Sequence, residues 1–144
     1  KLDESWNGWF RGWESKISNK KMLDLLEEHS GIIDSAERIM QGDRKMTRIL
    51  LTASVAIFSH YWFCLIDGDD AEQFFEWLEF GEGLDRSHPV SHLRNRLVSF
   101  ASKSGNRLKR EKMALIFKAW NFARNGESIG LLKYSQTEKF PTPR

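Results

Sequence analysis

The sequence predicts an all-α fold, a compact bundle of about six helices around a central hydrophobic helix. Apolar residues recur at intervals of three and four in one segment after another, which is the period of an amphipathic helix. No segment alternates apolar and polar residues as a half-buried strand does, and only one proline, Pro89, precedes residue 140. The 144 residues fit one domain, which we expect over residues 1–140, with a loose tail at residues 141–144.

Residues 1–16 predict a tryptophan-rich arm. Its aromatic residues are spaced as on one helical face: Trp6, Trp9, Phe10 and Trp13. Gly8 and Gly12 each weaken a helix by roughly 1 kcal/mol relative to alanine. We therefore expect a short helix or an irregular arm that packs its rings on the body of the protein. Rings that stay exposed would instead form a binding patch.

Two helices are expected next. The first is capped by Ser18 or Asn19 and ended by Gly31 in a left-handed conformation, and the second is a short helix over residues 32–42. The most hydrophobic run follows as Ile49–Ile66, whose 18 residues are at the lower limit of a membrane span. Because His60 and several hydroxyl groups interrupt this run, we expect a central buried helix and no membrane partner.

An acidic helix is predicted after Asp67 and Gly68. Asp69 or Asp70 lies at its N-terminus, where the helix dipole stabilises a carboxylate, and Gly81 and Gly83 end it. Its inward-facing residues are expected to be Phe74, Phe75, Trp77, Leu78 and Phe80.

The last two helices flank a polar loop, Ser102–Asn106. The first of them begins at Pro89, which suits the first position of a helix, directly after Ser87 or His88. The second ends at Gly126, and its apolar face, which includes Trp120, is so wide that it must be buried on more than one side. The remaining strip of that helix carries Arg110, Glu111, Ala114, Lys118 and Asn121. We expect the Asn121 side chain to bind nearby backbone groups.

No catalytic or metal-binding set is found in the sequence. His60 and Cys64 are four residues apart, a spacing that metal ligands use, but a buried histidine beside an inert thiol explains them without a metal. Helix capping explains Asp85 and Ser87, whereas His92 keeps an open role as a pH-sensitive or phosphate-contacting group. We therefore expect no enzymatic activity and no cofactor. The single cysteine favours a reducing compartment, the cytoplasm.

The net charge is only +2, but acidic and basic residues are distributed unevenly along the chain. Residues 1–85 contain 9 Lys and Arg against 17 Asp and Glu, whereas residues 86–144 contain 13 against 3. Such asymmetry is typical of a nucleic-acid surface, of a surface for an acidic partner, or of a dimer with complementary halves. It is also explained if the two halves simply attract each other in the folded chain.

The basic residues are densest around the polar loop Ser102–Asn106. Cations on a loop that leads into a helix suit phosphate contact, because they displace counterions and the helix N-terminus adds backbone donors. The sequence contains no pattern typical of a DNA-recognition helix, so we predict no contacts to the edges of the bases. The residues predicted to contact nucleic acid are Arg96, Lys103, Arg107, Lys109, Arg110, Lys112, Lys118 and Arg124.

Two runs, residues 72–97 and 114–128, carry a set of helical packing motifs. These are Phe74-Phe75, Gly81-Glu82-Gly83-Leu84, His88-Pro89, Leu93-Arg94, Leu97 and Lys118-Ala119-Trp120-Asn121. The pattern resembles the C-terminal helical region of phage- and prophage-type ParB-like proteins, which have an N-terminal Asp-Gly-Gln-His-Arg motif. The resemblance covers roughly residues 17–140, and it implies a helical accessory domain that contacts DNA or mediates assembly.

The ParB-like module with that motif is absent from this chain. Because the chain also begins at Lys1 without an initiator methionine, we expect a piece of a longer protein. The leading hypothesis is a non-catalytic, DNA-associated helical domain of a phage or mobile-element protein. The alternative is a module for protein–protein interaction or self-association that uses the acidic helix, Asp69–Glu82, or the tryptophan-rich arm.

Overall fold

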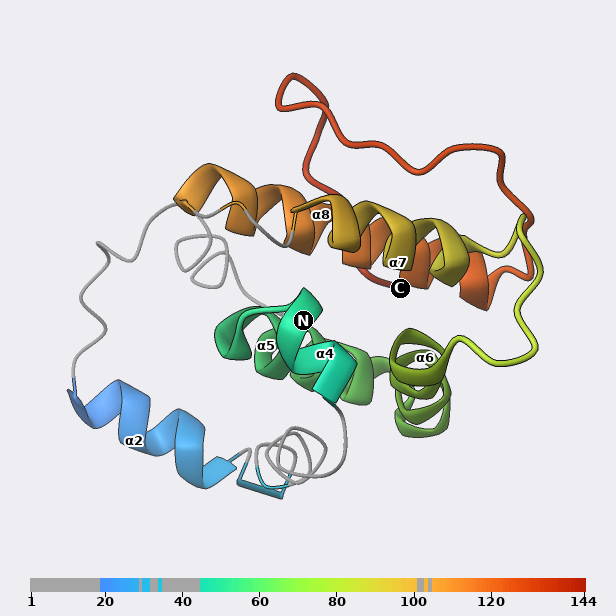
Figure 1. Cartoon of the computed structure of the whole chain (residues 1–144). Helices are drawn as coiled ribbons and strands as arrows, with labels where there is room; N and C mark the ends of the chain where they lie inside the picture. Colours follow the sequence, from blue (N-terminus) through green and yellow to red (C-terminus); the bar gives the residue numbers. More distant parts are fainter. Residues whose placement is uncertain (1–18, 29, 32–33, 35–44, 101–102, 104) are drawn as a thin grey trace.

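The computed structural model describes residues 19–28, 30–31, 34, 45–100, 103 and 105–144 (Figure 1). These residues form α-helices and connecting segments, and no strand occurs among them, so the predicted all-α class is confirmed. The number of helices is a property of the whole chain and stays a prediction. The arm at residues 1–16 and most of the short helix at residues 32–42 lie outside the described residues.

Helices α4 to α8 pack in a bundle in which α7 and α8 run antiparallel, with α4 and α5 beneath them and α6 at one end, whereas α2 lies apart from them (Figure 1). Their bounds are α2 (Asn19–Glu28), α4 (Lys45–Leu50), α5 (Ala53–Ile66), α6 (Gly68–Phe80), α7 (Pro89–Phe100) and α8 (Asn106–Arg124). Among the described residues, none of these helices combines the length and the apolar character needed to cross a membrane.

The core is built around aromatic rings from α5, α6 and α8. Trp120 of α8 stacks on Phe63 of α5 with the ring centroids 4.0 Å apart and the planes inclined by 6°. Phe74 of α6 meets the same tryptophan edge-on at 5.7 Å. Most side chains of α5 between Val55 and Phe63 are buried, so this helix faces neighbours on several sides.

The predicted single helix over Ile49–Ile66 is wrong, because the chain breaks at Leu51 and Thr52 to give α4 and α5. The break turns the start of α4 toward α6, where the buried Glu79 carboxylate accepts from the amides of Met46 (3.0 Å) and Thr47 (2.7 Å). The Thr47 hydroxyl donates to the same carboxylate at 2.7 Å. A residue 32 positions away therefore caps α4, satisfying N–H groups that the helix itself leaves without partners.

Both ends of α6 follow from its sequence. Asp69 and Asp70 lie in its first turn, as predicted, and the Asp67 side chain caps that turn by accepting from both of their amides. Gly81 ends the helix in the left-handed conformation with φ 66°, also as predicted. Phe80 was expected to face inward but is 59% exposed, since it lies outside the buried face formed by Phe74, Phe75 and Leu78. Gly31, expected to be left-handed, is helical with no positive φ.

The first residue of α7 is Pro89 and the glycine that ends α8 is Gly126, as predicted. The wide apolar face of α8 is confirmed by the burial of every residue from Lys112 to Phe117 and of Ala119 and Trp120. Ala114, expected on the polar strip, is also buried. The reason is that the residues after α8 fold back over this strip. We name residues 127–144 the strap.

The end of the strap is not loose, contrary to the prediction for residues 141–144. Asn121 on α8 donates from Nδ2 to the Thr142 carbonyl at 2.9 Å and accepts from the Arg144 amide at 3.0 Å. The expectation that Asn121 binds nearby backbone is thus confirmed. The backbone that it binds belongs to the terminal residues.

Candidate nucleic-acid interface

The end of the bundle where α7 stops and α8 starts carries the most open cations of the predicted set. Lys103 lies between the two helices and Arg107 lies in the first turn of α8, and both side chains are exposed. Neither makes an ion pair with any residue that the structure describes. These two residues therefore keep the positions that the sequence predicted for phosphate contact.

Arg96 joins this group from α7. Its Nη2 lies 3.5 Å from Glu111 Oε1 on α8, and its guanidinium lies 5.0 Å from the centroid of the Phe100 ring. Glu111 is one helical turn after Arg107, so Arg96 and Arg107 approach the same side of α8. The Arg96 side chain remains 44% exposed, and an ion pair this open is weak and easily exchanged for another anion. We name Arg96, Lys103 and Arg107 the cationic end.

Lys109 and Arg110 are half-buried. The Arg110 guanidinium lies 4.9 Å from the centroid of the Phe140 ring, which belongs to the strap. Its charge is therefore covered on one side, and Arg110 is less accessible than the sequence predicted.

Lys112 does not belong to an open interface. Its side chain is on the buried face of α8 between Leu108 and Ile116, and the residue is only 6% exposed. Burial lowers the pKa of Lys112, since the charged form loses its hydration. The predicted phosphate contact at this position is corrected to a buried lysine.

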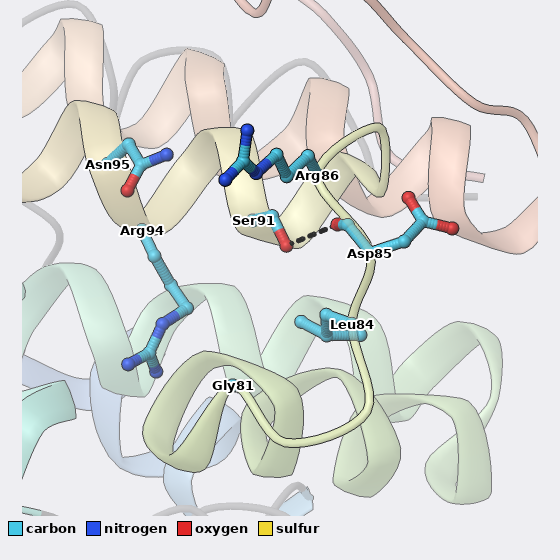
Figure 2. Close-up of a pocket in the computed structure, with 7 residues that line it drawn as sticks. All are labelled: Gly81, Leu84, Asp85, Arg86, Ser91, Arg94 and Asn95. Atoms are coloured by element: carbon cyan, nitrogen blue, oxygen red, sulfur yellow. Dashed lines mark hydrogen bonds between the residues drawn. The ribbon is translucent and has the colours of Figure 1, made fainter.

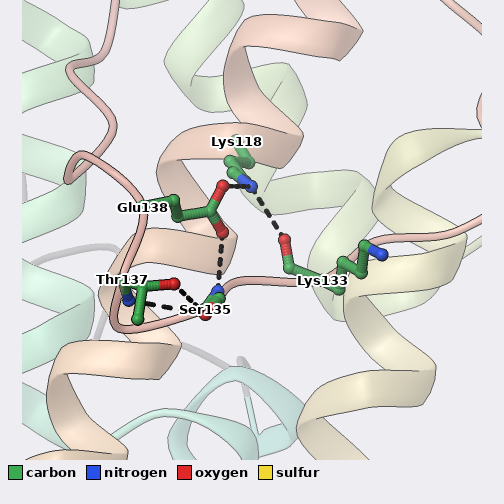
Figure 3. Close-up of polar contacts among 5 residues, drawn as sticks. All are labelled: Lys118, Lys133, Ser135, Thr137 and Glu138. Carbon is green, nitrogen blue, oxygen red and sulfur yellow. Dashed lines mark hydrogen bonds and ion pairs between the residues drawn. The ribbon is translucent and has the colours of Figure 1, made fainter.

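Lys118 and Arg124, the other two predicted contacts, are engaged within the fold. Lys118 Nζ donates to the Lys133 carbonyl at 2.9 Å and to Glu138 Oε2 at 2.8 Å, so it holds the strap (Figure 3). Arg124 Nη1 lies 3.1 Å from Asp70 Oδ2, and its guanidinium lies over the Trp120 ring. It therefore ties the end of α8 to the start of α6 and is not an open cation.

His60 and Cys64 are adjacent, with Cys64 Sγ 3.4 Å from His60 Nδ1. Burial, and then the charge of Glu72, raise the pKa of the Cys64 thiol, which opposes formation of the nucleophilic thiolate. His60 is buried and packs against the Phe75 ring at 5.2 Å. Within the described part of the chain, no group of three or more histidine, cysteine or acidic side chains is arranged to hold a metal ion.

The turn before α7 is organised by capping bonds. Asp85 Oδ1 accepts from the amide (2.7 Å) and the hydroxyl (2.6 Å) of Ser87, and these bonds lower the pKa of Asp85. His88 Nδ1 accepts from the Val90 amide at 3.2 Å, so the imidazole itself caps α7. Burial lowers the pKa of His88, although the nearby Asp85 carboxylate acts in the opposite direction.

An open pocket of about 330 Å³ lies between this turn, the end of α6 and α7 (Figure 2). Its lining residues are Gly81, Leu84, Asp85, Arg86, Ser91, Arg94 and Asn95. The Arg94 guanidinium points at the end of α6, where it donates to the carbonyls of Leu78 and, at 3.5 Å, Trp77. The positive φ of Gly81 favours glycine, and a Cβ atom there would come within 2.9 Å of Arg94 Cζ and displace the guanidinium from its place at the end of α6. Among these lining residues, Arg94 caps α6 and Asp85 holds the turn before α7.

The capping roles of Arg94 and Glu79 were not predicted from the sequence. Arg94 does fall on the opposite flank of α7 from Arg96, which is a signal that it faces a different neighbour. Comparison with known proteins adds no further assignment, because no family model, curated protein or solved structure matches this chain.

Proposed function

We propose that this chain is a non-catalytic helical domain that binds the phosphate backbone of DNA through the cationic end. The observation that carries the proposal is the exposure of Lys103 and Arg107 beside the weakly paired Arg96, where α7 and α8 meet. Polyanion binding gains its free energy from counterion release, which needs accessible cations and no specialised pocket.

Backbone contact fits α8 better than base readout does. A recognition helix must present an accessible face to the major groove. Helices α5, α6 and α7 and the strap all contact α8, so its middle presents no continuous open face, whereas Arg107 in its first turn is exposed. The proposal is therefore sequence-independent binding.

The resemblance to the helical region of ParB-like phage proteins supports the biological context that we propose for this domain. The domain would belong to a phage or mobile-element protein that acts on DNA in the cytoplasm, and the single free thiol of Cys64 agrees with that compartment.

The test is fluorescence anisotropy of a 20-base-pair labelled duplex at 50 and 200 mM salt. Three phosphate contacts give a slope of log K against log salt of about −2.7, or about a 40-fold loss of affinity over this range. Lys103→Gln/Arg107→Gln leaves one contact and reduces the loss to about 3.5-fold. The matched control, Lys20→Gln/Arg86→Gln, removes the same charge from exposed positions elsewhere and should keep the steep slope. Equal slopes for the two double variants would contradict the proposal.

A second candidate function rests on α6. Its solvent side carries the carboxylates of Asp69, Glu72 and Glu76, and Phe80 is 59% exposed on the same helix. An exposed aromatic ring beside acidic side chains suits a protein partner or a second copy of the chain. A dimer in size-exclusion chromatography, together with no DNA binding at 50 mM salt, would favour this alternative. The tryptophan-rich arm lies outside the described residues.

A further inference from the structure

A polar stripe runs along α8 beyond the cationic end. Arg107, Arg110, Ala114, Lys118 and Asn121 are spaced by three or four residues, so their side chains share one face of the helix. Arg107, at the start of the stripe, is open to solvent. The other polar members of the stripe are each in contact with the strap.

The strap contacts these residues with acceptor groups and with an aromatic ring. Glu138 Oε2 and the Lys133 carbonyl both accept from Lys118 Nζ, and the Thr142 carbonyl accepts from Asn121. A carboxylate and carbonyl oxygens around an ammonium are the same kind of acceptor that a nucleic-acid backbone supplies through its phosphates. The strap thus supplies acceptor groups to the α8 stripe, and among these contacts the Glu138 carboxylate is the charged one.

The two parts of the strap differ in how firmly they are held. Leu132 and Tyr134 are buried, and Phe140 packs edge-on against Phe117 at 6.0 Å. These apolar contacts anchor the strap on the body. By contrast, the Glu138 carboxylate lies at a surface, with its side chain 36% exposed and that of Lys118 22% exposed.

Glu138 is kept in place by local bonds. It accepts from the Ser135 amide at 2.6 Å as well as from Lys118, and these hydrogen bonds hold its pKa below the usual range for a glutamate. The carboxylate is therefore ionised at neutral pH. Figure 3 shows one carboxylate oxygen directed toward Lys118 on α8 and the other toward Ser135 in the strap turn.

We propose that the Glu138 carboxylate competes with nucleic-acid phosphate for Lys118, so that the strap limits how far a DNA backbone can extend along α8. The inference rests on the proposed function and extends its surface from the cationic end to Lys118. Exchange of one anion for another needs no unfolding, because a surface ion pair of this exposure has a small net free energy. The apolar anchors keep the strap attached while Glu138 turns away.

The decisive variant is Glu138→Gln, which removes the competing charge and keeps an oxygen that can accept from the Ser135 amide. Glu127→Gln is the matched control, since Glu127 is exposed, belongs to the same strap and bonds to Asn125 without contacting Lys118. Both variants lose one negative charge, so a gain that is specific to Glu138 cannot come from net charge. Circular dichroism and the thermal midpoint confirm that each variant is folded.

The anisotropy assay with the 20-base-pair duplex gives three distinct results. We expect Glu138→Gln to bind several-fold more tightly than Glu127→Gln at 50 mM salt and to steepen the salt slope by about 0.9, one additional phosphate contact. The double variant Glu138→Gln/Lys118→Gln should have the same slope of log K against log salt as the unaltered chain. Equal affinities for Glu138→Gln and Glu127→Gln would overturn the competition but leave the DNA-binding proposal standing. No binding by any variant at 50 mM salt would overturn both.

Discussion

Removing the Glu79 carboxylate should destabilise the whole bundle. Glu79 is on α6 but satisfies two amides at the start of α4 and the hydroxyl of Thr47, which is fully buried. A buried donor left without an acceptor costs about 1–3 kcal/mol. Two such donors belong to Thr47, whereas the Met46 amide is half-buried and water can reach it. We therefore expect Glu79→Ala to lower the free energy of unfolding by about 3–5 kcal/mol.

Two milder variants separate the contributions of the individual hydrogen bonds of Glu79 to the free energy of unfolding. Glu79→Gln keeps one oxygen that can accept from Thr47 but turns its NH₂ group toward the Met46 N–H, so we expect a loss of about 1–2 kcal/mol. Thr47→Val removes the hydroxyl alone and leaves both amides capped, with an expected loss of about 1 kcal/mol. The order of stability is then Thr47→Val, Glu79→Gln and Glu79→Ala, from smallest to largest loss.

Urea denaturation followed by tryptophan fluorescence and far-ultraviolet circular dichroism measures these losses. The control is Glu76→Ala, which removes an exposed carboxylate from the same helix and should stay within about 0.5 kcal/mol of the unaltered chain. If Glu79→Ala is no more destabilising than Glu76→Ala, the long-range cap does not stabilise α4.

Two further predictions concern Trp120 and His88. Trp120→Ala should cost about 3–5 kcal/mol in urea denaturation, and Trp120→Phe only about 1–2, because it keeps a ring against Phe63 and removes a buried Nε1 that has no hydrogen-bond partner among the described residues. Equal losses would contradict this reasoning. The pKa of His88 is lowered from 6.5 in the fold, so its contribution to stability is complete above pH 6.5 and is lost as the pH falls toward the lower folded pKa. Unfolding at pH 5 to 8 should show this loss, and His88→Asn, which keeps a capping oxygen, should remove it; an unchanged pH dependence would refute the assignment.

Local signals in the sequence predicted most of the described helix ends. Pro89, Gly81 and Gly126 act through their own backbone geometry, and Asp69 and Asp70 act within one turn, so none of them depends on a distant partner. The wide apolar face of α8 followed from helical periodicity in the same way.

Several errors arise where a distant residue decides the outcome. A helical projection gives the angle of Lys118 on α8 but cannot show that Glu138 will lie beside it. Lys112 is a different case, because the projection itself places it between Leu108 and Ile116 on the apolar face, where it is buried. The cap at the start of α4, by contrast, comes from Glu79, more than thirty residues away. For the interface, the sequence predicted a set of cations, and the contacts made by α6 and the strap decide which of them remain open.

The basic residues that the structure describes in the second half of the chain fall into two groups, those paired with the acidic half and those left unpaired by it. Some of them are neutralised inside the fold, since Arg124 from the basic half lies 3.1 Å from Asp70 in the acidic half. Arg94 lies at the negative end of the α6 dipole, which also joins the two halves. Lys103 and Arg107 take part in neither contact, and they are at the opposite end of α8 from Arg124. Internal attraction therefore accounts for the cations near α6 but not for those at the α7–α8 junction, and it is this remainder that an external polyanion would neutralise.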